Sequence, residues 1–84
     1  MNFIEHLFDL VSDTENKKIV GWSDDSSFTI HDVHKLTTVV FPDHFKHRNF
    51  ASFQRQLSAY DFCSSGPDVG ALTFTHKYNL FQRD

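Results

Sequence analysis

The chain has 84 residues and a formal net charge of −3 at pH 7, and its one cysteine, Cys63, has no internal partner for a disulfide. These values exclude a disulfide-bonded secreted scaffold and favour one small domain spanning residues 1–84 in a reducing compartment. No apolar run approaches the roughly 18 residues of a membrane span, so we expect a soluble intracellular protein with no membrane partner. Ten phenylalanines, two tyrosines and one tryptophan predict an aromatic core.

The first third of the chain predicts a helix followed by a hairpin. Asn2 and Glu5 are typical of a helix N-terminus, and we expect this helix to end within residues 12–16. Its apolar residues at helical spacing are Phe3, Leu7, Leu10 and Val11. Residues 19–22 and 27–30 are short β-prone runs on either side of a turn-rich tetrad, which predicts two paired strands.

The next segment predicts a second helix and a turn. Asp32 is expected to cap this helix, and Pro42 is expected to end or distort it. The side chains predicted to face the core are Val33, Leu36 and Val40. Residues 43–49 then form the turn before a third helix.

The third helix has an arginine opposite its apolar stripe. At about 100° per residue, Arg55 falls about 180° from the centre of the arc formed by Phe50, Phe53, Leu57 and Tyr60. Its neighbours on that side are small: Ala51, Ser52, Ser58 and Ala59. A DNA major groove accepts such a helix. On periodicity alone, the polar face of an amphipathic helix explains Arg55 better as a solvated residue, as most outward arginines are.

The last third predicts a second hairpin. Residues 62–64 and 72–76 are expected to pair as strands across a loop at 65–70, which carries glycine and proline and would form a wing. The predicted fold is therefore α+β, with a three-helix bundle and a small antiparallel four-stranded sheet in winged helix-turn-helix order.

The central run strongly resembles a known sequence. Phe45-Lys46-His47, then Asn49-Phe50-Ala51-Ser52-Phe53-Gln54-Arg55-Gln56-Leu57, then Tyr60 and Phe62, is similar to the recognition-helix segment of heat-shock-factor DNA-binding domains. The similarity covers nearly the whole chain, including Trp22, which in that family is a core residue. It implies a nuclear transcription factor of the stress-response type that binds specific double-stranded DNA sequences.

The resemblance also implies which residues contact DNA. Arg55 occupies the place of the family arginine that reads the guanine of a GAA-type element, where a guanidinium donates two hydrogen bonds to O6 and N7. The other contacts implied, to the sugar-phosphate backbone or the groove, come from Lys46, His47, Arg48, Asn49, Ser52, Gln56, Ser58 and Tyr60. The chain departs from relatives at Ser58, usually asparagine, at Asp61, usually glycine, and at Cys63 and Ser64, usually a basic pair.

The charge distribution is uneven along the chain. Residues 1–30 carry six acidic residues and two lysines, whereas residues 31–58 carry four Lys or Arg and two Asp. The net positive segment contains the third helix. We therefore expect a modest contribution from phosphate contacts to DNA affinity.

Other classes of function remain open from the sequence. The Arg55 face would also suit an acidic protein partner. A zinc site would use the pairs His31/His34 or His44/His47 with Cys63, although the spacing is weak evidence, and we expect no metal or cofactor. A nucleophile set of Asp61, Cys63 and His76 lacks a phosphate loop or a nucleophile elbow, so the chain is expected not to be an enzyme. Alone it is expected to be monomeric, with trimers only through a coiled coil beyond residue 84.

Overall fold

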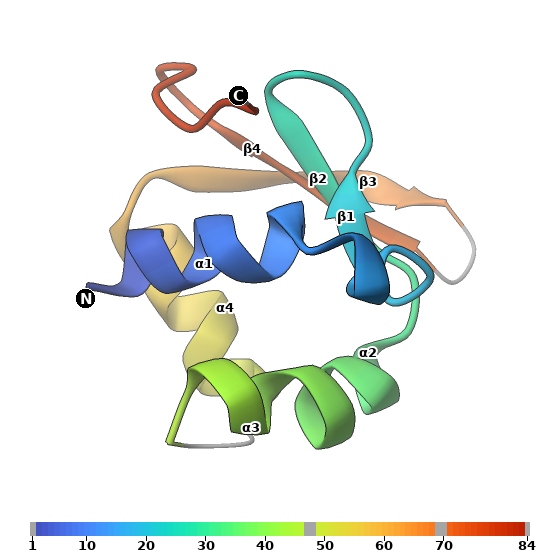
Figure 1. Ribbon diagram of the computed structural model, residues 1–84. Coiled ribbons are helices and arrows are strands. Elements are labelled where there is room, and N and C mark those ends of the chain that lie inside the picture. The colour runs from blue at the N-terminus through green and yellow to red at the C-terminus, as the bar shows by residue number, and fades with distance from the viewer. Residues whose placement is uncertain (1, 47–48, 69–70, 84) are drawn as a thin grey trace.

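The computed structural model describes residues 2–46, 49–68 and 71–83. Helices lie on one side of a four-stranded antiparallel sheet, as expected for a winged helix-turn-helix (Figure 1). The elements in chain order are α1 (Phe3–Ser12), η1 (Thr14–Asn16), β1 (Val20–Trp22), β2 (Ser27–Ile30), α2 (Val33–Lys35), η2 (Leu36–Val40), α3 (Phe41–His44), α4 (Phe50–Ala59), β3 (Phe62–Asp68) and β4 (Ala71–His76). Within the described ranges, no helix has the length and apolar character to cross a membrane.

Side-chain caps set where the helices begin. The Oδ1 atom of Asn2 accepts a hydrogen bond from the Glu5 amide at 3.0 Å, and Oδ1 of Asp32 accepts one from the Lys35 amide at 2.9 Å. Both predicted caps are confirmed. Asn49 caps α4 in the same way, at 3.2 Å from the Ser52 amide. Each cap satisfies one amide that has no partner within its helix.

The second helix continues further than predicted. Its chain runs without a break from α2 through the π-helical turn η2 into α3. Of the two predicted effects of Pro42, the helix therefore shows a distortion rather than an end, and residues 43 and 44 of the predicted turn belong to α3. Proline has no amide hydrogen and its ring clashes with the carbonyl four residues earlier. The wide turn relieves this conflict, because the Phe41 amide bonds instead to the carbonyl of Leu36, five residues back. Leu36 and Val40 are buried as predicted, but the prediction that Val33 faces the core is wrong, since 36% of its surface is exposed.

The sheet order is β1-β2-β4-β3, with every neighbouring pair antiparallel. On one face Ser27 and Thr29 of β2 pair through their hydroxyls with Thr75 and Thr73 of β4, at 2.6 and 2.8 Å. β3 is longer than predicted: residues 65–68, expected in the loop, belong to the strand. Ser65 and Asp68 pair with Thr73 and Ala71 of β4, and the register shifts between them. Val69 and Gly70 of the expected loop lie outside the described residues.

Two groups of aromatic side chains join the helices to one another and to the sheet. In the first, Phe3 of α1 packs against Phe45, Phe53 and Tyr60 with ring centroids 5.4–5.8 Å apart, and Phe41 lies 5.0 Å from Phe53. The second group connects the sheet, α1 and the C-terminal segment through Phe8, Trp22, Phe28, Phe62, Phe74 and Phe81. The aromatic core predicted from composition is confirmed, and its first group fixes the position of α4 against α1 and α3.

Candidate nucleic-acid interface

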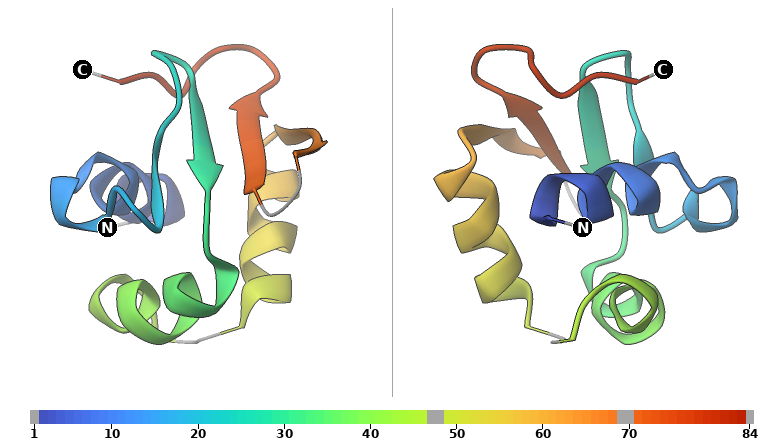
Figure 2. Two further views of the ribbon diagram at one scale, coloured as in Figure 1. Left: turned by 90° about the vertical axis from the view of Figure 1, so that its right-hand side faces the viewer. Right: turned by 60° about the vertical axis from the view of Figure 1, so that its left-hand side comes forward.

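One face of α4 is buried and the opposite face is open. Phe53 is fully buried and Leu57 is 1% exposed, whereas the side chain of Arg55 lies on the exposed face. Its exposed neighbours on the helix are Ala51, Gln54, Ser58 and Ala59. Figure 2 shows α4 at one side of the molecule, with α1 on the other side. The helical phase predicted from the sequence is therefore confirmed, and the small residues leave Arg55 as the long cationic side chain of this face.

A hydrogen bond inside α4 orients Arg55. Its Nη2 donates to the Oγ of Ser52 at 3.0 Å, one helical turn earlier. The bond occupies one of the five N–H groups of the guanidinium and leaves the others available. Residues three apart on a helix lie on neighbouring positions of one face. The sequence shows this spacing, but it does not show that the two side chains meet.

Some of the other residues predicted to contact DNA lie at or before the N-terminal end of α4. Asn49 is exposed and caps the helix, so its side chain has a structural role there. Lys46 is exposed in the turn after α3. His47 and Arg48, both predicted to contact DNA, lie outside the described residues.

The remaining candidates lie toward the C-terminal half of α4. Ser58 is exposed beside Arg55, while Tyr60 is 41% exposed and stacks on Phe3 at 5.4 Å. Gln56 is half-buried, and its Oε1 is buried without a hydrogen-bond partner among the described residues. The predicted site residues that the structure describes thus do not form one uniformly exposed surface, because Gln56 is partly buried and Tyr60 stacks on Phe3.

Asp61 ends α4 in a left-handed backbone conformation, with φ of 68°. Its amide donates to the Ser58 carbonyl at 3.1 Å, and its own carbonyl accepts from the Lys77 amide at 2.8 Å. Glycine is the residue that adopts this conformation without steric cost, which agrees with the glycine that the resemblance implies at this position. The carboxylate also adds negative charge at the negative end of the helix dipole.

In the described part of the chain, the residues of the alternative hypotheses do not assemble into a site, and His47 of the pair His44/His47 lies outside that part. Among the described residues, no three His, Cys, Asp or Glu side chains gather in a metal-binding group. Cys63 is exposed on β3, whereas His76 is buried and its Nδ1 accepts hydrogen bonds from the Tyr78 and Leu80 amides at 3.1 and 3.4 Å. The His76 side chain therefore stabilises the turn after β4.

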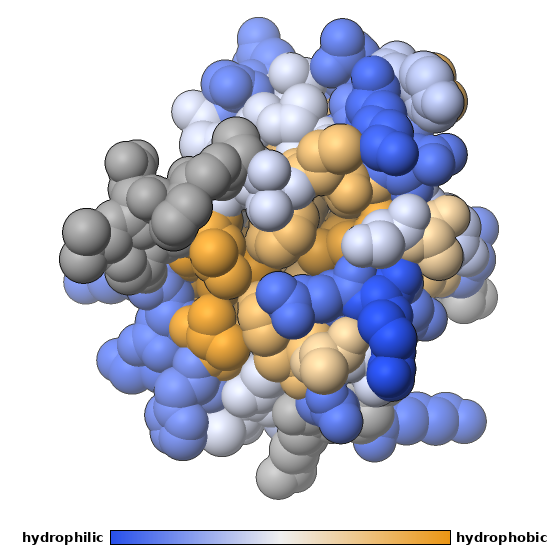
Figure 3. Space-filling view, turned by 180° about the vertical axis from the view of Figure 1, so that it is seen from behind, coloured by the Kyte–Doolittle hydropathy of each residue, from blue (hydrophilic) through white to orange (hydrophobic). Residues whose placement is uncertain are grey.

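Figure 3 shows the molecule from behind, the side on which α4 and β3 lie. Apolar side chains gather in the middle of this face and hydrophilic ones surround them. Thymine methyl groups make contacts with apolar side chains in the major groove, while phosphates need hydrogen-bond donors and base edges need polar side chains. The face thus combines both kinds of surface beside α4.

The helices pack against a four-stranded sheet, and α4, with one open face, is followed by the hairpin of β3 and β4. This arrangement defines a winged helix-turn-helix. A family model described as HSF-type DNA-binding matches residues 3–84. The chain belongs to this family and is a DNA-binding domain of the transcription-factor class rather than an enzyme.

Similar proteins agree with this assignment. The chain is 42% identical to the transcription factor prr1 of Schizosaccharomyces pombe over 83% of its length, and 48% identical to SKN7 of Saccharomyces cerevisiae over 71%. These matches cover only 13% and 10% of the two relatives. Skn7 of Chaetomium thermophilum solved with HSE DNA has a TM-score of 0.88 and 39% identity, covering 98% of this chain and 87% of that one.

Proposed function

We propose that the domain binds double-stranded DNA at GAA-type elements, with α4 in the major groove and Arg55 reading a guanine. The observation that carries this proposal is the orientation of α4: Phe53 and Leu57 anchor the helix while Arg55 lies exposed among small side chains. Small neighbours allow the helix backbone to approach the bases closely. A guanidinium then reaches guanine O6 and N7 in a bidentate arrangement.

The remaining candidates position the helix. Lys46, Asn49, Ser52 and Ser58 are polar residues on or beside the face of Arg55, suited to phosphate and sugar contacts that set register. Tyr60 would contribute through its exposed part, and Gln56 has a buried amide oxygen without a donor. His47 and Arg48 belong to the proposed contacts on the resemblance alone.

The relatives support the wider proposal. Skn7 has been solved with HSE DNA and with SSRE DNA, and a heat shock transcription factor has been solved in complex with DNA, at 32–39% identity to this chain. We infer that the protein acts in the nucleus in stress-related transcription. Residues 1–84 act as one domain that is monomeric in isolation, and any trimer needs a coiled coil outside them.

Replacement of Arg55 by alanine tests the proposal. Arg55→Ala is expected to weaken binding to a GAA-containing duplex by about 1–3 kcal/mol, because two hydrogen bonds to one guanine are lost. Thermal stability should stay nearly unchanged, since the side chain is exposed. Lysine at this position should restore binding only in part, because it lacks the planar pair of donors.

Fluorescence anisotropy with matched GAA and scrambled duplexes measures both effects. Gln54→Ala, at the neighbouring exposed position, is the control and should bind as the unaltered protein does. An equal loss on both duplexes would make Arg55 a phosphate contact and would contradict its role in base reading.

A further inference from the structure

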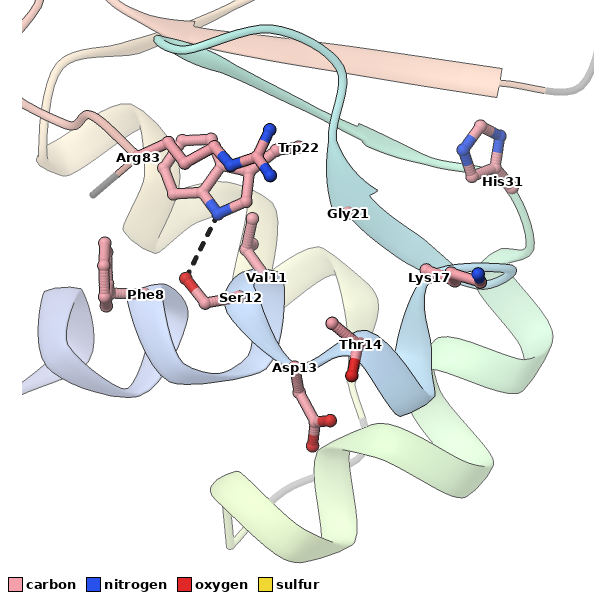
Figure 4. A pocket seen from close by; sticks show the side chains of 10 residues that line it. All are labelled: Phe8, Val11, Ser12, Asp13, Thr14, Lys17, Gly21, Trp22, His31 and Arg83. Carbon is pink, nitrogen blue, oxygen red and sulfur yellow. Dashed lines mark hydrogen bonds between the residues drawn. The ribbon is translucent and has the colours of Figure 1, made fainter.

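A hollow lies on the side of the molecule away from the exposed face of α4. It has a volume of about 360 Å³ and is formed by the C-terminal end of α1, by η1 and by β1 (Figures 1, 2 and 4). Its apolar walls include Val11 and Trp22, and Gly21 of β1 also lines it. Cavities of about 300–1,000 Å³ with apolar walls and a few polar groups are typical of small-ligand sites.

Basic side chains from three separate segments line this hollow. Lys17 follows η1, His31 follows β2, and Arg83 belongs to the C-terminal segment. Within the described residues, no carboxylate forms an ion pair with any of the three, although the chain carries more Asp and Glu than Lys and Arg. The acidic residue of the lining, Asp13, bonds through Oδ1 to the Glu15 amide at 2.9 Å, and its carboxylate points away from Trp22 in Figure 4. The hollow therefore has unpaired positive charge.

The indole of Trp22 is a fixed flat surface beside this charge. Its Nε1 donates to the Oγ of Ser12 at 3.1 Å, and its ring stacks on Phe81 at 5.1 Å. Figure 4 shows the Arg83 guanidinium beside the indole. The Arg83 amide donates to the Asp25 carbonyl at 2.8 Å, which ties this segment to the turn between β1 and β2. An apolar surface and a cation are thus held next to each other.

We propose that this hollow binds a small organic anion in which a flat apolar group carries a carboxylate or a phosphate. The apolar group lies against Trp22 and Val11, and the anionic group is held by Lys17 and Arg83, with His31 at the edge. Charge-assisted hydrogen bonds supply the recognition of the anion. Because the hollow and the exposed face of α4 lie on different sides, ligand and DNA bind at the same time.

The intrinsic fluorescence of the protein reports directly on this site, because Trp22 is the one tryptophan of the chain. The probes are phenyl phosphate and benzoate, compared with inorganic phosphate and with benzyl alcohol. We expect a saturable fluorescence change with at least one of the two aromatic anions. Binding of inorganic phosphate or benzyl alcohol as tight as that of both aromatic anions would overturn the proposed ligand class.

Variants separate the hollow from nonspecific charge effects. Lys17→Gln and Arg83→Gln should each weaken binding about tenfold through the loss of a charge-assisted hydrogen bond, whereas Lys18→Gln, which removes a neighbouring exposed charge, should not change it. Gly21→Val should reduce binding by filling the hollow. If it does not fold, Gly21→Ala serves, because its Cβ would meet the Lys17 Cα at 3.7 Å, an ordinary contact. No saturable change, or equal effects of Lys17→Gln and Lys18→Gln, would overturn the proposal.

Discussion

At the scale of single residues, the function proposed for Arg55 depends on a neighbour as much as on exposure. A free arginine side chain loses conformational entropy when it is ordered against a base. The bond to Ser52 at 3.0 Å already restricts the guanidinium in the free protein, which reduces the part of this cost that binding must overcome. Ser52 is in this respect a positioning residue for Arg55.

A double-mutant cycle measures this coupling. Ser52→Ala should weaken binding to the GAA duplex by about 0.5–1.5 kcal/mol, as expected for one hydrogen bond. The loss should be smaller when Arg55 is already alanine, because the bond between the two side chains is then absent. Ser52→Thr keeps the hydroxyl and should retain much of the affinity. Equal losses from Ser52→Ala in both backgrounds, measured by anisotropy, would mean that Ser52 contacts DNA independently of Arg55.

At the scale of the helices and strands, the sequence correctly predicts the features that depend on a short stretch of neighbouring residues. Asn2 and Asp32 cap helices because their carboxyl or amide oxygens can reach amides three residues on, and Phe53 and Leu57 are buried because the apolar period of α4 is regular. The phase of the recognition helix, and with it the exposure of Arg55, follows from that period. The bond between Ser52 and Arg55 depends on side-chain rotamers, which spacing does not determine.

Other features depend on contacts that a local pattern does not contain. The π-helical turn at Leu36–Val40 changes the period of the second helix, which a regular helical spacing does not predict, and Val33 in the preceding turn is 36% exposed. Residues 65–68 look like a loop because they include Gly66 and Pro67, yet pairing with β4 extends the strand through them. The left-handed backbone of Asp61 was visible only through comparison with the glycine usual in relatives.

The burial of α4 makes a prediction about stability. Phe53→Ala should lower the free energy of unfolding by about 3–5 kcal/mol, because it removes a ring that contacts Phe3 and Phe41 and leaves a cavity. Gln54→Ala, at an exposed position of the same helix, should change it by less than about 0.5 kcal/mol. Urea unfolding followed by circular dichroism gives both values. A stable protein with a polar residue at position 53 would contradict the orientation of α4.

The turn between β1 and β2 predicts a small dependence of stability on pH. The Ser26 amide donates to Oδ1 of Asp24 at 2.8 Å, and this hydrogen bond lowers the pKa of Asp24 from its ordinary value of 3.8. The stabilisation is fully present above that ordinary pKa and is lost as the pH falls through the lowered pKa of the folded state. Asp24→Asn lacks this titration. The difference in melting temperature between the two proteins should therefore be constant from pH 5 to 7 and change below about pH 4.

At the scale of the whole molecule, negative and positive charges lie on different sides. The exposed acidic residues Glu5 and Asp9 lie on α1, while the net positive segment 31–58 contains α4. Figure 2 places α1 and α4 on different sides. An acidic protein can therefore present a cationic surface to DNA, but with few cations. Segment 31–58 has Lys35, Lys46 and Arg55 among the described residues, and Arg48 outside them.

The small number of cations predicts a weak dependence of DNA binding on salt. If about two to four phosphates are neutralised, the slope of log affinity against log salt concentration should be roughly −2 to −4, at about −0.9 for each phosphate. Asp61→Gly should strengthen binding at every salt concentration, because it removes a negative charge from the end of α4. It should also stabilise the fold by about 1 kcal/mol, since glycine adopts a φ of 68° without strain.

Titration of both proteins against one GAA duplex at several salt concentrations measures the slope and the effect of the substitution together. Gln54→Gly serves as the control, because it places a glycine at an exposed position of α4 outside the proposed DNA contacts without changing a charge. Weaker binding by Asp61→Gly would mean that the Asp61 carboxylate makes a favourable contact with the complex, such as accepting a hydrogen bond from a cytosine N4 amino group. A slope much steeper than −4 would mean that cations outside the α4 region also reach the phosphates, so that the DNA contacts more of the molecule than the recognition helix and its preceding turn.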